Sequence, residues 1–158
     1  MEIWIAQCLE TWQINQRVNV YLLDAIPPEG LTSVLPSGRT RTVARMFVHL
    51  HHMRLQRIEV SAPELLGRLT KFARKDAALD QKRLKNALEQ SGEAIAQLIE
   101  IGLEKGKIKG YRPHPIGFLG YMISHEAHHR GEICVALTES GHKLDDAVLY
   151  GQWDWSQR

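Results

Sequence analysis

Histidine is the residue type in this sequence whose spacing most plainly suggests chemistry. The chain contains eight histidines. Six of them lie in two short segments, as His49, His51, His52, His125, His128 and His129. Imidazole nitrogen is a favoured ligand of zinc, nickel, copper and iron, and it binds zinc at ~2.0–2.1 Å. A divalent-metal site is therefore the first chemistry that the sequence indicates.

The second of these segments contains two histidines at helical spacing. His125 and His129 lie four residues apart, so one face of a helix would present both imidazoles to one ion. Met122 and Ile133 share that stripe, which makes it an inward-facing one. Two neutral core histidines are the alternative interpretation, but a pair at this spacing favours a metal. His128 points to one side and is expected at the surface or next to a ligand.

Residues 125–129 also fit the pattern H-E-x-x-H of zinc peptidases, in which the glutamate is a general base. The longer form of that motif requires glycine at 132 and histidine at 135, where this chain has Glu132 and Val135. The match therefore supports a metal more than it supports peptidase chemistry. Glu126 is the nearest candidate catalytic base, but helix rotation points it ~100° from His125, so a structural ion pair is the alternative.

A reactive metal site usually has three protein ligands and one open position. Segment 49–52 lies on the second predicted helix, which a bundle can bring beside the fourth. Periodicity places His49 and His51 on opposite borders of that helix's apolar arc, so spacing does not choose between them. An acid at position 145 or 146 is another possible source of a ligand. The alternative interpretation of segment 49–52 is a solvated polar edge.

Helical periodicity accounts for most of the chain. Apolar residues recur at threes and fours over four stretches, namely 3–26, 39 or 40 to 60, 79–105, and 113 or 115 to 139 or 140. Pro27 ends the first stretch, and Ser61 is expected to cap a short segment that starts at Pro63. These helices and their short connections predict an all-α four-helix bundle, with room for short extra helices in the connections. Residues 1–158 are expected to form a single domain.

Two further features of the predicted helices concern burial. Arg130 lies in an apolar sector of the fourth helix, so it should be buried beside a carboxylate of this chain or of a second subunit. The broad apolar surface of that helix fits a central or interface element and predicts a homodimer. Asn15, Asn19 and Tyr21 on the first helix could line a pocket, although surface positions are the favoured interpretation.

Composition limits the class of protein and its partners. Apolar residues make up 44% of the chain and charged residues 24%, with a net charge of +2, so neither a disordered polymer nor a basic nucleic-acid-binding surface is indicated. No apolar run reaches the ~18–20 residues of a membrane span, and residues 1–4 lack the features of a signal peptide. Cys8 and Cys134 form no disulfide framework or metal motif. We expect a cytoplasmic protein without membrane or nucleic-acid partners.

Two segments together resemble a known family. Residues 42–50, with their helical histidine, and residues 125–133, with H-x-x-x-H followed by Arg-Gly, look like the DinB/YfiT-like superfamily of metal-binding four-helix bundles. The tail 150–155 resembles one branch of it. The resemblance implies that His49, His125 and His129 bind a divalent metal. Glu132 stands where the family often has glutamine, and a carboxylate there could orient a ligand histidine or change the charge of the pocket.

The resemblance also implies a function. The metal would be zinc or nickel, with iron or manganese as alternatives, and the protein would be a homodimer. The leading hypothesis is a metal-dependent transferase or hydrolase that activates a thiol or water for attack on a small molecule, with a low-molecular-weight thiol as cosubstrate. One alternative is a metal-dependent binding or stress-response module without turnover. A zinc peptidase of the H-E-x-x-H type is the other.

Overall fold

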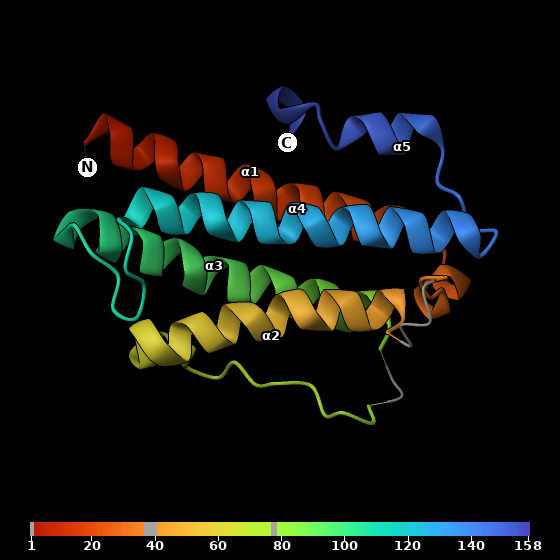
Figure 1. The fold of residues 1–158 in the computed structure, drawn as a ribbon, viewed down its shortest axis with the longest axis horizontal. Coiled ribbons are helices and arrows are strands. Elements are labelled where there is room, and N and C mark those ends of the chain that lie inside the picture. Colours follow the sequence, from red (N-terminus) through yellow and green to blue (C-terminus); the bar gives the residue numbers. More distant parts are fainter. Residues whose placement is uncertain (1, 37–40, 77–78) are drawn as a thin grey trace.

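The structure is a computed structural model that describes residues 2–36, 41–76 and 79–158. Four long helices lie side by side, and a short fifth helix follows them (Figure 1). Their bounds are α1 (Ile3–Ala25), α2 (Val43–Ser61), α3 (Gln81–Lys105), α4 (Pro115–Glu139) and α5 (Asp146–Gly151). Short 3-10 helices at Pro28–Thr32, Pro63–Leu66 and Trp155–Gln157 occupy the connections and the tail. The prediction of an all-α four-helix bundle is confirmed.

Side-chain caps set the starts of three helices. The hydroxyl of Thr42 accepts a hydrogen bond from the Arg45 backbone N–H at the start of α2, and the Asp80 carboxylate accepts one from Arg83 at the start of α3. His114 Nδ1 accepts from the backbone N–H of Gly117 at the start of α4. The start of α2 expected at 39 or 40 lies outside the described residues.

The segment after α2 differs from its sequence-based prediction. Ser61 is the last residue of α2 and does not cap the 3-10 helix at Pro63–Leu66. Its hydroxyl instead donates to the carbonyl of Lys109, which ties the end of α2 to the connection before α4. A serine next to a proline is ambiguous in sequence because its hydroxyl can bond forward in the chain or across to another segment.

Buried polar residues divide the core into two apolar clusters. One cluster contains Leu22, Phe47, Leu50, Leu88 and Ile133, and the other contains Trp12, Ile58, Ile95, Phe118 and Met122. Between them, at mid-length of the four helices, lies a set that we call the polar layer. Its members are Asn15 and Asn19 of α1, Arg54 of α2, Ser91 of α3, and Glu126 and Arg130 of α4.

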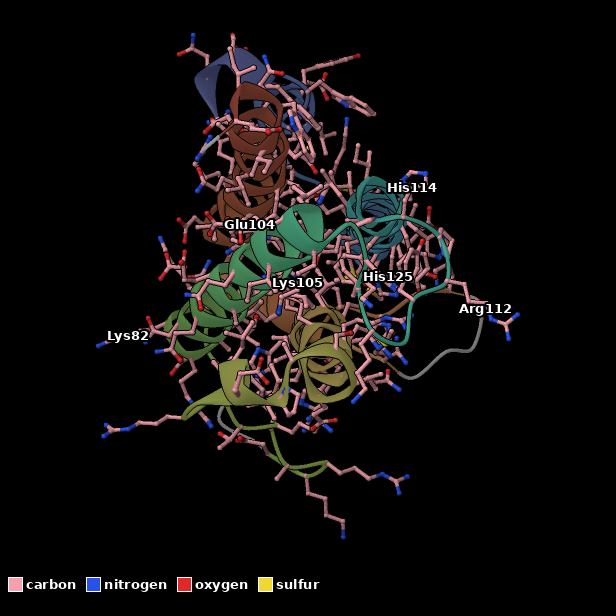
Figure 2. All side chains as sticks on the ribbon, turned by 90° about the vertical axis from the view of Figure 1, so that its left-hand side faces the viewer. Lys82, Glu104, Lys105, Arg112, His114 and His125 are labelled. Atoms are coloured by element: carbon pink, nitrogen blue, oxygen red, sulfur yellow. The ribbon has the colours of Figure 1, made fainter. Side chains whose placement is uncertain are left out.

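The outside of the bundle carries the long charged side chains. Figure 2 looks along the bundle and shows Lys82 and Arg112 extending away from it, whereas His125 lies on the side of α4 that faces α2. None of the described helices combines the length and apolar character that crossing a membrane requires.

Candidate metal centre

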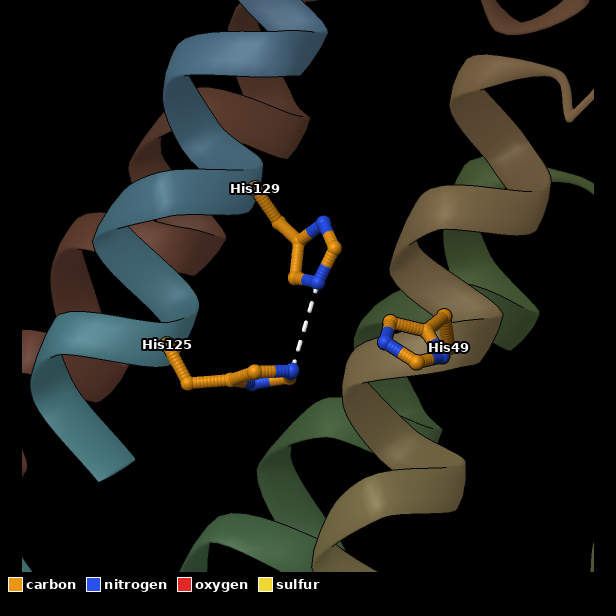
Figure 3. A group of neighbouring side chains, drawn as sticks. All are labelled: His49, His125 and His129. Atoms are coloured by element: carbon orange, nitrogen blue, oxygen red, sulfur yellow. Dashed lines mark hydrogen bonds between the residues drawn. The ribbon is translucent and has the colours of Figure 1, made fainter. Parts of the chain in front are cut away.

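Three histidines from two helices meet between α2 and α4. His125 and His129 project from successive turns of α4 toward His49 of α2 (Figure 3). Their ring centroids lie 4.6 Å apart, and the His49 ring lies 4.6 Å from that of His129 and 5.4 Å from that of His125. One ring nitrogen from each of the three lies within 4.8 Å of the other two. We call this group the three-histidine cluster.

These distances fit a metal ion. The Nε2 atoms of His125 and His129 are 3.2 Å apart. Two nitrogens bound tetrahedrally to one zinc at ~2.0–2.1 Å would lie about 3.3–3.4 Å apart, so this pair needs little rearrangement. Among the described histidines, cysteines and acids, no fourth residue joins the cluster at this spacing. The three histidines could therefore hold a metal ion and leave it a position that no protein ligand fills.

Glu132 orients one of the three rings. Its carboxylate accepts a hydrogen bond from His129 Nδ1 at 2.7 Å, and it also lies 3.5 Å from Nε2 of the exposed His128. A proton held on Nδ1 leaves the lone pair of His129 on Nε2, which faces His125 and His49. Carboxylates commonly support metal-binding histidines in this way and increase their basicity.

Burial keeps the three histidines neutral at pH 7. Burial, together with the smaller effect of the nearby positive charge of Arg41, lowers the pKa of His49 to about 4. Burial also lowers the pKa of His125 and, although Glu132 opposes the shift, that of His129. Neutral imidazoles keep the lone pairs that a metal requires.

The cluster lies next to an aromatic and cationic surface that the sequence analysis did not identify. The Tyr121 ring stacks on His125, with centroids 6.2 Å apart and planes inclined by 21°. Arg57 donates to the Tyr121 hydroxyl at 3.0 Å, and its guanidinium lies 5.0 Å from the centre of that ring. Tyr121 lies one helical turn before His125, so its place beside the cluster could have been predicted from the sequence. The position of Arg57 beside it depends on how α2 packs against α4, which the sequence does not show.

The other histidines of segment 49–52 have structural partners. The two ring nitrogens of His51 lie 3.0 Å from the carbonyl oxygens of Ala87 and Thr70, on the α3 side of α2. His52 Nε2 accepts from the backbone N–H of Phe72. Of His49 and His51, between which spacing did not choose, the structure therefore brings His49 to His125 and His129. Asp146, one of the acids considered as a ligand, pairs with Lys143 at 3.3 Å instead.

Glu126, the candidate base, lies in the polar layer and is 1% exposed. Arg54 binds it with Nε and Nη2 at 2.7 and 2.9 Å, and the amides of Asn15 and Asn19 donate to it at 2.6 and 2.7 Å. Burial alone would raise the pKa of Glu126, but these four donors bring it below its ordinary value. These contacts stabilise the ionised form of Glu126 and are those of a structural carboxylate.

Arg130 is buried as expected, but its partners differ from the expected carboxylate. Its Nη1 donates to the side-chain oxygens of Asn15 and Asn19 at 2.9 and 2.8 Å. The same two asparagines donate to Glu126, so each bridges an arginine and a glutamate. The interpretation of Asn15 and Asn19 as surface residues was wrong, because both are fully buried. Their spacing of four residues, together with the burial expected for Arg130, could have indicated that both asparagines are buried as its partners.

A helical bundle with a three-histidine cluster between its second and fourth helices defines a class of candidate metal-binding bundle proteins. The model of the DinB family matches residues 1–156, and the chain belongs to that family. Searches of curated proteins and of solved structures each found no match. The resemblance stated from the two histidine segments is therefore confirmed at the level of the family.

Proposed function

We propose that this protein is a metal-dependent enzyme that activates a thiol or water for attack on a small molecule, with His49, His125 and His129 as the metal ligands. The observation that carries the proposal is the convergence of three ring nitrogens, all within 4.8 Å of one another, with no fourth ligand among the described residues. A divalent cation held by neutral imidazoles would act as a Lewis acid that lowers the pKa of water or of a thiol.

The residues around the cluster have separate roles in this proposal. Glu132 holds the His129 ring in its ligating orientation. Arg41 and Arg57 attract an anionic reactant such as a thiolate, and Tyr121 offers a ring face to its apolar part. Glu126 anchors Arg54 and the asparagines and moves no proton, because its two oxygens already accept four hydrogen bonds inside the bundle.

Zinc or nickel fits an all-imidazole site best, since iron and manganese sites more often include carboxylate ligands. We also propose a homodimer in the cytoplasm. The family resemblance supports the dimer, and the composition with two unpaired cysteines supports the location. Light scattering on tag-free protein at micromolar concentration measures the mass, and a monomer would contradict the dimer.

The function can be tested on tag-free protein stripped with chelator and reloaded with one equivalent of zinc or nickel. Two probes cover the two nucleophiles. Glutathione with 1-chloro-2,4-dinitrobenzene reports transfer, in which a carbon–sulfur bond forms and chloride leaves. 4-Nitrophenyl acetate with water reports hydrolysis, which releases 4-nitrophenol and acetate. We expect saturable turnover of at least one probe that chelator abolishes and metal restores.

Two variants of α4 serve as controls. His125→Ala removes a proposed ligand and should show neither stoichiometric metal nor turnover, whereas Glu139→Ala changes an exposed residue of the same helix and should keep both. Stoichiometric metal with no rate above that of His125→Ala for either nucleophile would indicate a binding module instead of an enzyme. Absence of stoichiometric metal in the unsubstituted protein would overturn the metal site itself.

A further inference from the structure

A pocket lies on the opposite side of α4 from the three-histidine cluster. It has a volume of about 410 Å³ and is formed between α4 and residues 146–158, which we call the C-terminal segment. Its walls are mainly apolar, with Ile123 and Ala127 on α4 and Leu149, Trp153 and Trp155 on the C-terminal segment. This volume falls within the range of ~300–1,000 Å³ that small-molecule sites usually have.

The polar feature of this pocket is the Arg130 side chain, which is 9% exposed. Nη1 makes both hydrogen bonds that the structure gives Arg130, those to Asn15 and Asn19. Nε and Nη2 donate to none of the described residues. Because Arg130 lines the pocket, these N–H groups remain for a bound molecule.

The charge of the polar layer is not balanced. Arg54 and Arg130 contribute two positive charges and Glu126 one negative charge, which leaves one positive charge in the interior. Arg54 makes the direct ion pair with Glu126, whereas the asparagines separate Arg130 from it. An anion in the pocket would neutralise the remaining charge, which is costly when buried and unpaired.

We propose that the pocket between α4 and the C-terminal segment binds a small organic carboxylate, whose anionic group pairs with Arg130 and whose apolar body lies against Trp153 and Trp155. A guanidinium presents parallel N–H groups that match the two oxygens of a carboxylate. Trp153 is 82% exposed, and a ligand in the pocket would cover part of its indole. Such a site is separate from the proposed metal centre.

The experiment compares 3-phenylpropionate with 3-phenylpropan-1-ol, which has a hydroxyl in place of the carboxylate. Calorimetry gives the affinities, and tryptophan emission excited at 295 nm reports on Trp153 and Trp155. We expect the carboxylate to bind at least about tenfold more tightly than the alcohol, as a charged hydrogen-bonded pair would require. We also expect it to change the emission. Equal affinity of the two compounds would overturn the proposal.

Two glycines of α4 supply a matched pair of variants. A Cβ added at Gly131, which lines the pocket, or at Gly120, which does not, meets no atom within 4 Å. Leucine is a better helix former than glycine, so both variants should fold. Gly131→Leu places a side chain at the pocket and should weaken 3-phenylpropionate binding at least about tenfold. Gly120→Leu should leave the affinity unchanged, and equal effects of the two variants would contradict the site.

Two further measurements separate this proposal from the others. Affinity for 3-phenylpropionate should be the same in metal-free and zinc-loaded protein, so loss of the metal centre leaves the prediction intact. A carboxylate that binds only with zinc present would belong to the metal centre and overturn the pocket. Unchanged affinity after Gly131→Leu would place the carboxylate elsewhere and overturn it as well. If the protein is a dimer and 3-phenylpropionate dissociates it, a second copy of the chain occupies this surface. That result would also overturn the proposed pocket.

Discussion

The three-histidine cluster and the polar layer both include residues of α4, and they differ in how their hydrogen-bonding capacity is used. The three-histidine cluster faces α2, and its rings approach one another with few other partners. The polar layer faces the bundle interior, where Glu126 accepts four hydrogen bonds from three side chains. Both contain residues of the H-E-x-x-H segment. The number of hydrogen-bond partners, more than the residue type, therefore distinguishes side chains that are available for chemistry from those that support the fold.

The two groups should respond differently to substitution. Substitutions in the three-histidine cluster should change metal binding and leave the stability of the metal-free protein nearly unchanged. Substitutions in the polar layer should change stability first. Variants that fail to separate in this way would contradict this expectation.

The largest effect is expected for His125→Ala. Removal of one of three ligands should reduce bound zinc from about one per chain to below about a tenth, because two imidazoles hold the ion weakly. Elemental analysis of tag-free protein measures the content. The free energy of unfolding of the metal-free variant should match that of the parent within about 1 kcal/mol, since His125 is only half-buried. Full zinc content in the variant would exclude His125 as a ligand.

The next effect is on stability. Glu126→Ala should lower the free energy of unfolding by about 3–5 kcal/mol, because it leaves Arg54 buried without a counter-charge. Urea titration at pH 7 measures this quantity. The matched control is Glu10→Ala, which breaks an exposed ion pair with Arg17 and should cost less than about 1 kcal/mol. Equal costs for the two variants would show that the buried pair contributes no more than a surface one.

A smaller effect is expected for Glu132, the carboxylate that contacts the three-histidine cluster. Glu132→Ala should weaken zinc binding about 10–100-fold, because His129 loses the hydrogen bond that orients its ring. Competition with a chromophoric chelator gives the affinity. Glu139→Ala removes an exposed acid from the same helix and should have no effect. Unchanged affinity in Glu132→Ala would remove Glu132 from the site.

The smallest effect concerns pH. The unfolded chain should bind a proton at His49 near its ordinary pKa of 6.5, whereas burial lowers the folded pKa to about 4. Between these values the unfolded state holds more protons, so the stability of the metal-free protein should fall as pH drops from 6.5 toward 4. Because His49 is only partly buried, we expect a loss of about 1 kcal/mol at pH 5. His49→Ala should reduce the slope, and an unchanged slope would assign it to other groups.

The sequence predicted the four helices and two of the three clustered histidines because both follow from local spacing. His125 and His129 share a helix, so helical rotation alone brings them together. The choice of His49 over His51 needed the family resemblance. Either histidine could face α4, depending on how α2 is rotated about its own axis. The partners of Arg130 could not be predicted at all, since two asparagines more than a hundred residues away supply them.

The polar layer also constrains how the helices can slide past one another. It includes residues of all four long helices, between two apolar clusters. A slip of α4 by one turn, about 5.4 Å, would move Glu126 away from Arg54 and leave both charges facing hydrocarbon. Apolar side chains alone tolerate such slippage far better. The buried ion pair thus fixes the position of α4 relative to α2 along the bundle axis. The same relative position keeps His49 of α2 beside His125 and His129 of α4.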